Sequence, residues 1–314
     1  MKWCVWICVL AHSLFSYTDL AVTYEFSRGR FGDNVLSYLH AKWFAYQRNI
    51  TLLYKPFQFS SQLAMHLKEK HYGTMLPAQA YMRHYLARGP VNPSIQLPIL
   101  YICPYFPEDK WELESTCDMS GNSWYHFDVD WQDPGFRKIA REMVAPAHSL
   151  TLQNLPHNTV NIALHVREGG GYDSADGYLY WPLKIPPLTY YVESLKRVLA
   201  YLPPGKALCC HLFTDAANPR EIAEKIEQEI SSIKIAFRKT NNHHNRNVLE
   251  DFFSLFKFDI LIRSQSNFAL VPSLIHDYAI LVAPKDCKIF GDVVTITETD
   301  FIVNQPLLDE VLRR

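Results

Sequence analysis

The chain has 314 residues, which is enough for one large domain or for two of about 150 residues each. It carries 31 basic and 32 acidic residues, so its formal net charge is -1, and no run of like charge resembles a nucleic-acid-binding tail. Hydrophobic residues make up 48% and aromatic residues 14% of the chain, which is ample for a large core and also fits stacking on sugars or bases. The composition therefore argues against sequence-independent binding to nucleic acid.

The N-terminal segment has the features of a targeting signal. Lys2 precedes the apolar run Trp3–Ala11, which is too short to span a bilayer comfortably and is typical of a signal-peptide core. We predict a signal peptide over residues 1–21, export through the secretory pathway, and no transmembrane span after its removal. The alternative is that this segment forms a buried first strand.

The cysteines do not predict a disulfide framework. Cys103 and Cys117 flank an irregular region and could pair in an exported protein, whereas Cys209 and Cys210 lie in an apolar run typical of a core. No spacing matches a zinc site, so we expect no metal ligands.

The first half of the chain predicts a βαβ unit. Its strand, helix and strand cover residues 22–26, 35–47 and 51–54. The connection before the helix, Ser27–Asn34, contains Gly29 and Gly32 and is predicted to be a glycine-bearing turn. It lacks the third glycine of the dinucleotide-binding fingerprint.

The middle of the chain, from about Gly89 to Gly135, changes character. Prolines recur there and Trp and Tyr cluster, which favours long loops and short elements over a regular layer. We therefore place a domain boundary near residue 150, with one α/β domain over 22–150 and a second over 151–314.

The second half alternates again between apolar runs and amphipathic segments. This pattern predicts repeated βα units, hence a parallel sheet covered on both faces, with ligands at the carboxyl ends of its strands. The predicted strands cover 160–165, 207–213, 234–237, 259–262 and 279–282, and the helices lie within 187–202, 219–230, 248–258 and 267–276.

The most informative motif follows the first of these strands. Residues two apart in a strand face the same way, so His165 and Arg167 should point together, just before the glycines that begin at Gly169. Arginine beside a glycine turn at a strand's carboxyl end suits a diphosphate. The alternative is a surface arginine and a core histidine ahead of an ordinary turn.

Three further motifs follow predicted strands or open predicted helices. The pair Thr214-Asp215 could contact ribose or base, or could cap the next helix. Free backbone N–H groups and hydroxyls at Ser264 and Ser266 form an anion site or a plain serine N-cap. The acidic pair Glu250-Asp251 could accept hydrogen bonds from a purine, or could be a solvated helix start.

Together these motifs resemble the fucosyltransferase superfamily with a GT-B fold, which includes alpha-1,2-, alpha-1,6- and protein O-fucosyltransferases. The resemblance spans roughly residues 24 to 284. Its matching elements are His165-Val166-Arg167, Thr214-Asp215, Ser264 and Ser266 with nearby Phe268, and Gly29-Arg30-Phe31-Gly32.

This chain departs from the family at two places. The alpha-1,2 and alpha-1,6 groups follow the first arginine with a second, where this chain has Glu168. The protein O-fucosyltransferases have asparagine after the second glycine, where this chain has Asp33 followed by Asn34. An aspartate at position 33 could serve as a base.

The resemblance implies two Rossmann-like domains with parallel sheets facing a cleft, an acceptor-side domain followed by a nucleotide-sugar-binding domain. It implies inverting transfer of fucose from GDP-fucose to a hydroxyl of a glycan or protein, without a metal or other cofactor. The alternative, favoured by Glu168, is a non-catalytic nucleotide- or glycan-binding protein on a decayed GT-B scaffold.

The resemblance also implies roles for individual residues. Arg167 would stabilise charge on the leaving diphosphate and Asp33 would accept the acceptor's proton. Gly29 and Gly32 would let the first domain close on the sugar. The expected substrate-binding residues are Gly29, Arg30, Gly32, Asn34, His165, Thr214, Asp215, Glu250, Asp251, Ser264, Ser266 and Phe268.

Overall fold

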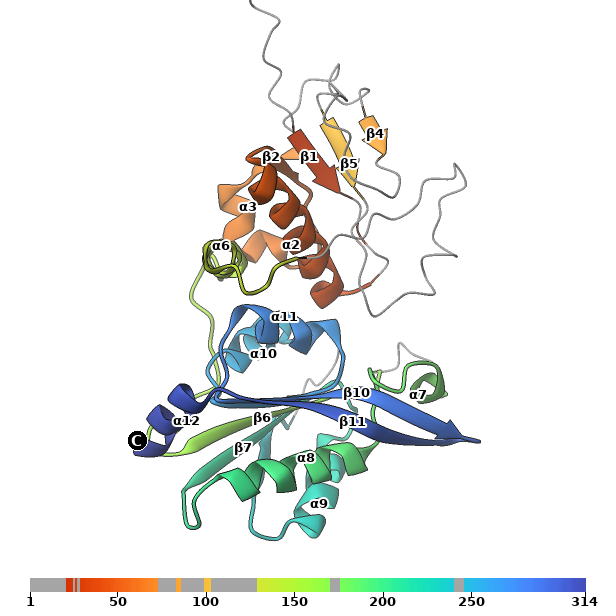
Figure 1. Cartoon of the computed structure of the whole chain (residues 1–314), viewed down its shortest axis with the longest axis vertical. Coiled ribbons are helices and arrows are strands. Elements are labelled where there is room, and N and C mark those ends of the chain that lie inside the picture. The colour runs from red at the N-terminus through yellow and green to blue at the C-terminus, as the bar shows by residue number, and fades with distance from the viewer. Residues whose placement is uncertain are drawn as a thin grey trace, which may run out of the picture. The chain divides into compact units, whose positions relative to one another are not determined.

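The computed structural model divides the chain into two compact units, Met1–His148 and Ser149–Arg314 (Figure 1). It describes residues 21–24, 26, 29–72, 83–85, 99–102, 129–169, 176–239 and 246–314. The division lies next to the boundary that the sequence places between residues 150 and 151. Apart from Ala21, the predicted signal peptide lies outside the described residues, as do Cys103 and Cys117.

The first unit contains a parallel sheet in the order β3-β2-β1-β5-β4. The buried helix α2 leads from β1 to β2, so the predicted βαβ unit is present. The elements are β1 Ala21–Tyr24, α2 Phe31–Arg48, β2 Thr51–Tyr54, a 3-10 turn Ser60–Gln62, α3 Ala64–Lys68, β3 Lys70–His71, β4 Arg83–Tyr85, β5 Ile99–Ile102 and α6 Pro134–Val144.

Two of these elements correct the sequence interpretation of the middle region. Strand β5 lies inside the segment expected to lack a regular layer, yet it pairs with β1 over its whole length. It is only four residues long and directly follows Pro98, so prolines dominate its surroundings. Helix α6 begins at Pro134-Gly135, a pair typical of turns. Pro134 occupies the first helical turn, where its missing N–H costs nothing, and Asp133 caps the helix by accepting from the Phe136 N–H at 2.6 Å.

The second unit contains a sheet in the order β11-β10-β9-β6-β7-β8, whose strands run parallel except for β11. The parallel part has the strand order of a doubly wound Rossmann-like sheet. The chain first adds β7 and β8 on one side of β6, and then adds β9 and β10 on the other side. The α/β class with parallel sheets is therefore confirmed.

Apart from the short helix α7, which the sequence did not predict, the bounds of its elements agree with the predicted βα units to within a few residues up to the start of β10. They are β6 Val160–Val166, α7 Gly177–Tyr180, α8 Leu188–Tyr201, β7 Leu208–Thr214, α9 Pro219–Glu229, β8 Ile235–Phe237, α10 Val248–Leu255, β9 Ile260–Arg263, α11 Asn267–Ile275, β10 Ile280–Phe290, β11 Val293–Val303 and α12 Gln305–Arg313.

The sequence did not predict the hairpin formed by β10 and β11. The strand expected over 279–282 continues to Phe290 and returns antiparallel from Val293, and the hairpin projects beyond the rest of the sheet (Figure 1). Beyond Pro284 most of its residues are exposed, so no buried apolar run marks the strand there. The tip of this hairpin lines a pocket.

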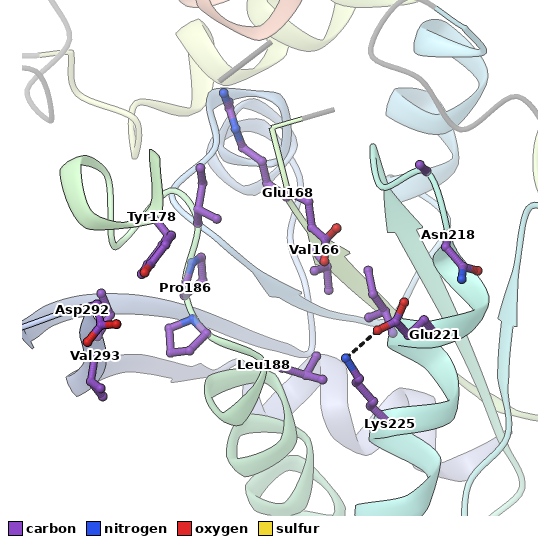
Figure 2. Close-up of a pocket in the computed structure, with 16 residues that line it drawn as sticks. Val166, Glu168, Tyr178, Pro186, Leu188, Asn218, Glu221, Lys225, Asp292 and Val293 are labelled. Carbon is purple, nitrogen blue, oxygen red and sulfur yellow. Dashed lines mark hydrogen bonds and ion pairs between the residues drawn. The ribbon is translucent and has the colours of Figure 1, made fainter. Parts of the chain in front are cut away.

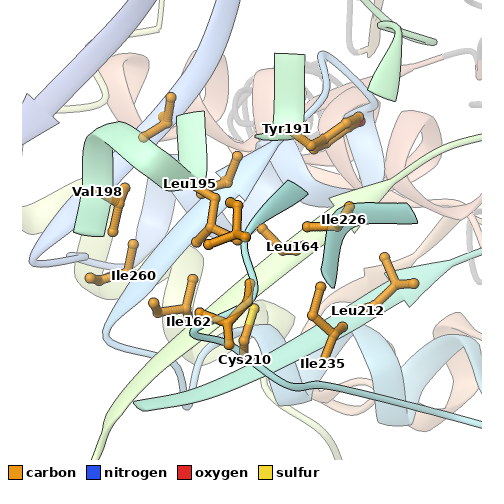
Figure 3. Close-up of a cluster of buried hydrophobic side chains, with 14 of the residues drawn as sticks. Ile162, Leu164, Tyr191, Leu195, Val198, Cys210, Leu212, Ile226, Ile235 and Ile260 are labelled. Atoms are coloured by element: carbon orange, nitrogen blue, oxygen red, sulfur yellow. The ribbon is translucent and has the colours of Figure 1, made fainter. Parts of the chain in front are cut away.

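The two faces of the second sheet bury different sets of side chains. Along β6, Ile162 and Leu164 belong to the large cluster shared with α8 and α9 (Figure 3), whereas Ala163 belongs to a smaller cluster shared with α10 and α11. Because strand side chains alternate, His165 faces the α10–α11 side together with Ala163. His165 of the predicted site therefore lies on the side with the smaller core.

None of the helices in the described part of the chain combines the length and the apolar content that crossing a bilayer requires.

Candidate functional site

The second sheet brings the predicted diphosphate motif to its topological switch point. Strands β6 and β9 are hydrogen-bonded neighbours, and His165 on β6 is in register with Arg263 on β9. In a doubly wound sheet the chain turns away in opposite directions from these two strands, which leaves a crevice at their carboxyl ends where ligands bind. The motif at 165–169 and the segment Ser264–Asn267 both begin at this edge.

The start of α11 presents hydrogen-bonding groups at this edge. Ser264 is fully buried, and its hydroxyl lies 3.4 Å from His165 Nδ1 and accepts from the Ser266 N–H at 3.3 Å. Ser266 is the N-cap of α11, yet its side chain makes no capping bond to the helix backbone within the described residues. This helix start is not the plain serine N-cap that was one of the two sequence interpretations.

His165 is a buried and neutral member of the site. Its ring stacks on Phe268 with centroids 5.6 Å apart and planes 23° apart. Burial lowers the pKa of His165 to about 4, and the positive charges of Arg167 and Arg263 lower it further, against an opposing effect of Asp215. At neutral pH the imidazole therefore serves as an uncharged hydrogen-bonding group rather than as a cation.

Arg263 is a site residue that the sequence interpretation missed. The predicted strand stopped at Ile262, whereas β9 includes Arg263, which is 9% exposed and donates from Nη1 to the Ser264 carbonyl at 3.0 Å. Its own carbonyl accepts from the Tyr190 hydroxyl at 2.8 Å. The available signal was an arginine directly after an apolar strand and directly before Ser-x-Ser.

Thr214 and Asp215 accept hydrogen bonds from backbone N–H groups of the loops at this edge. The Thr214 hydroxyl accepts from the Ala216 N–H at 3.1 Å, and Asp215 Oδ1 accepts from the Glu168 N–H at 2.8 Å. Neither caps the following helix, because the N-cap of α9 is Asn218. Asp215 therefore ties the chain leaving β6 to the chain leaving β7, and the capping interpretation is wrong.

The acidic pair on α10 lies at β8, beyond β7 from the switch point. Asp251 forms an ion pair with Arg238, which follows β8, and burial raises the pKa of the Asp251 carboxyl against this ion pair. Asp251 is thus already engaged by a cation. The purine contact predicted from the sequence for this acidic pair would therefore lie at this outer part of the edge.

A second buried histidine, which the sequence analysis did not single out, lies in the same region. His211 on β7 is 6% exposed and packs against Phe213 and Phe258. Burial, followed by the charge of Arg238, lowers its pKa to about 4, and its Nδ1 has no hydrogen-bond partner in the described part of the chain. The signal was a histidine inside an otherwise apolar strand.

The predicted site residues of the first unit lie at the start of α2. Here the structure corrects the predicted bounds of the turn and the helix. Helix α2 already begins at Phe31, so Gly32, Asp33 and Asn34 form its first turn instead of a flexible connection. Asp33 Oδ2 accepts from the Arg30 N–H at 2.8 Å and so satisfies the backbone ahead of the helix.

The packing of Asp33 also explains Gly29. A Cβ at position 29 would lie 2.2 Å from Asp33 Cγ, so this glycine is required by a close approach. Asn34 has a buried side-chain oxygen that accepts no hydrogen bond from the described residues. These residues belong to the first unit, whereas His165 belongs to the second.

Comparisons with known proteins give distant structural similarities. No family model matches the chain, and no curated protein matches it either. Fucosyltransferase NodZ from Bradyrhizobium is 15% identical, with a TM-score of 0.45 over 92% of this chain and 100% of that one. A FUT1 mutant of Arabidopsis thaliana in complex with GDP is 14% identical, with a TM-score of 0.46 over 90% of this chain and 74% of that one.

POFUT1 in complex with GDP-fucose is 11% identical, with a TM-score of 0.43 over 84% of this chain and 96% of that one. These similarities are too distant to assign a role to any residue of this chain. The roles proposed below come from its own motifs and geometry.

Proposed function

We propose that this protein is a glycosyltransferase that binds a nucleotide-diphosphate sugar in its second unit and moves the sugar, with inversion, to a hydroxyl of a glycan or protein. The observation that carries this proposal is the convergence of Arg167 and Arg263 with the uncapped start of α11 at the switch point of a Rossmann-like sheet. GDP-fucose is the proposed donor because the order of the motifs resembles that of GT-B fucosyltransferases.

The charge of the edge suits the leaving group of such a reaction. Arg167 and Arg263 are cations, His165 is neutral and Asp215 is the nearby anion that acts on it. The start of a helix adds a partial positive charge from its aligned peptide dipoles. As the sugar leaves, negative charge grows on the outer phosphate, and fixed donors at that point stabilise the transition state more than the ground state.

The same edge has room for the rest of the nucleotide. From β6 the sheet continues through β7 to β8, which spans about 10 Å at the usual spacing of strands. Asp251 pairs with Arg238 at the far end of this span, and the adjacent Glu250 is the carboxylate that we propose accepts hydrogen bonds from the N–H groups of guanine. We propose that the diphosphate lies at β6 and β9 and the base toward β8.

The arrangement offers positive charge for a diphosphate from side chains of the unit itself. The two arginines supply the positive charge that a metal ion provides in other nucleotide-sugar enzymes, and Arg167 has the planar, bidentate geometry that a phosphate matches. We therefore propose a metal-independent reaction, and turnover that is unchanged by a chelator is the expected result.

Calorimetric titration tests the binding part of this proposal. The full chain is titrated with GDP, UDP, ADP and CMP, and GDP is expected to bind most tightly. Release of GDP from GDP-fucose is then followed with and without candidate acceptors. Binding without any turnover would instead support a non-catalytic nucleotide-binding protein, and no nucleotide binding would reject both functions.

A further inference from the structure

A cavity opens at the same strand end, on the opposite side of the sheet from His165. It has a volume of about 650 Å³ and is bounded by the end of β6, the approach to α8, the start of α9 and the tip of the β10–β11 hairpin (Figure 2). Val166 and Ile222 in its wall belong to the core shared with α8 and α9. His165, Ser264 and Phe268 are not among the described residues that line it.

Arg167 and Glu168 connect this cavity to the proposed diphosphate site. Both line the cavity, and they follow each other directly after β6. Arg167 acts on His165, which faces α10 and α11, whereas the Glu168 carboxyl is acted on by Glu221 and Lys225 of α9, on the other face. Arg167 therefore borders both the cavity and the His165 side of the strand end, whereas the Glu168 carboxyl lies toward α9.

The backbone holds Glu168 in this place. Its N–H donates to Asp215 Oδ1 at 2.8 Å, and the next residue, Gly169, has a φ of 87°, which a residue with a side chain adopts only at a cost. A turn directly after Glu168 thus needs the glycine that the sequence has there. The hydrogen bond to Asp215 and the turn at Gly169 thus fix the backbone of Glu168, although its side chain is exposed to solvent.

The walls of the cavity suit an uncharged molecule with many hydroxyls. Glu168, Glu221 and Asp292 oppose Arg167 and Lys225, so the lining has no excess of positive charge for a nucleotide. The Glu221–Lys225 ion pair, at 2.7 Å, offers both a donor and acceptors.

Further groups around the cavity fit such a molecule. Asn218 and Tyr178 can hydrogen-bond hydroxyls, and Leu188 and Val293 offer apolar surface for a sugar ring. In Figure 2, Asp292 and Val293 lie across the cavity from Glu221 and Lys225. Its volume falls in the range of about 300–1,000 Å³ that is usual for small-ligand sites.

We propose that this cavity is the acceptor site and that Glu168 is the catalytic base that takes the proton of the acceptor hydroxyl. This inference rests on the proposed transferase function and moves the base from Asp33, whose carboxylate holds the start of α2, to the residue beside Arg167. Burial, followed by the charges of Asp215 and Glu221, raises the pKa of Glu168 against an opposing effect of Lys225. A carboxylate with raised proton affinity is a better base.

The reaction step is then complete with groups of this unit. The acceptor oxygen forms a bond to the anomeric carbon, and its proton passes to the Glu168 carboxylate. The bond between the anomeric carbon and the β-phosphate oxygen breaks, and its electron pair stays on GDP, where Arg167 stabilises it. Because Arg167 borders both the proposed diphosphate site and the cavity, the base and the leaving-group cation can act on one pair of donor and acceptor.

The first test replaces Glu168 by glutamine, which keeps the shape and removes the base. GDP release from GDP-fucose in water should fall about 100-fold or more in Glu168→Gln. GDP affinity, measured by calorimetry, should stay within about twofold, since the phosphate donors remain. Glu224→Gln, a change of an exposed glutamate on the same helix as Glu221, should leave both unchanged.

Added azide distinguishes a base from a structural residue. Azide attacks the anomeric carbon without losing a proton, so it should restore GDP release in Glu168→Gln but not accelerate an unfolded variant. Wild-type rates in Glu168→Gln, or an equal loss of GDP affinity, would overturn the assignment of the base. A wild-type chain that cleaves no GDP-fucose would instead reject the transferase function, and this inference with it.

The second test fills the cavity. Ala217 is an exposed residue of the lining, and Ala217→Trp should block the acceptor site, whereas Ala200→Trp on the exposed side of α8 is the matched control. Saturation-transfer NMR with lactose and N,N′-diacetylchitobiose, in the presence of GDP, should show binding to the wild type and to Ala200→Trp but not to Ala217→Trp. Equal signals in all three, or no signal from either sugar, would overturn the assignment of the cavity.

Discussion

Two helices of this protein begin just after a parallel strand, and their first turns are built in opposite ways. Helix α2 of the first unit has an acidic residue in its first turn, Asp33, whose carboxylate accepts from the Arg30 N–H. Helix α11 of the second unit has no acidic residue in its first turn, and in the described residues its N-cap Ser266 makes no side-chain cap. We call the start of α2 closed, because a carboxylate of its own first turn lies there, and the start of α11 open, because its first turn has no carboxylate.

The difference has an electrostatic consequence. Each helix start carries about half a positive charge from its aligned peptide dipoles. At α2 the carboxylate of Asp33 offsets this charge, whereas at α11 the neighbouring Arg263 adds to it. A free anion should therefore bind at α11 and not at α2, although both follow the carboxyl end of a strand.

The largest expected effect concerns the cation at the open site. Arg167→Ala should slow transfer by about 3 kcal/mol of transition-state stabilisation, the scale of one lost donor to the developing charge. The free energy of unfolding should change little, and lysine at position 167 should restore only part of the rate, because it lacks the bidentate fork. Steady-state release of GDP from GDP-fucose measures the loss.

Arg197→Ala is the control for this change, because that arginine lies on the exposed part of α8 over Phe301. Turnover and nucleotide affinity that stay the same in Arg167→Ala would show that the motif at 165–169 is only a turn, and the contrast between the two helix starts would lose its functional meaning.

The open site should also make the second unit sensitive to acid. The pKa of His165 is about 4 when folded, below its usual 6.5, because of burial and the two arginines. Between these pH values the unfolded chain binds a proton that the folded chain does not, so stability is present above pH 6.5 and is lost as the pH falls toward 4. The slope should be about 1.4 kcal/mol per pH unit for this residue.

Urea unfolding of wild type and His165→Gln at several pH values between 7 and 4 measures this slope. The variant should show a shallower loss, while His157→Gln, at an exposed position, should behave as the wild type. Equal slopes in wild type and His165→Gln would show that the histidine does not stay neutral in the folded chain.

The closed helix start predicts a change in stability without a change in nucleotide binding. Asp33→Ala should destabilise the first unit by about 1 kcal/mol through the lost cap. Gly29→Ala should destabilise it too, because the new Cβ would meet Asp33 Cγ. Denaturation curves report both effects, and calorimetry with GDP should find the affinity unaltered. A loss of turnover in Asp33→Asn with normal stability would restore Asp33 as the base.

The smallest effect is expected from the N-cap of α11. Ser266→Ala should weaken GDP binding by about 1 kcal/mol, the scale of one neutral hydrogen bond. It should hardly change the free energy of unfolding, because its hydroxyl does not cap the helix. Asp133→Ala at α6 is the matched contrast, since Asp133 does cap its helix and its loss should cost about 1 kcal/mol of stability. Equal losses of stability in the two variants would remove the distinction.

The sequence by itself determined the alternation of strands and helices in the second unit and the side of β6 on which His165 lies. These features are local, since a buried run with period-two alternation sets both the strand and its faces. It also placed Arg167, Ser264 and Ser266 at strand ends, because apolar runs end where polar residues and glycines begin.

Only the tertiary structure decided which of these ends belong to one site. Arg263 became a site residue because β9 pairs with β6, and β5 became part of a sheet because it pairs with β1. Likewise, Glu168 faces a cavity whose far wall comes from residues 292–294. Such contacts join positions far apart in the chain or depend on packing, so no local pattern in the sequence encodes them.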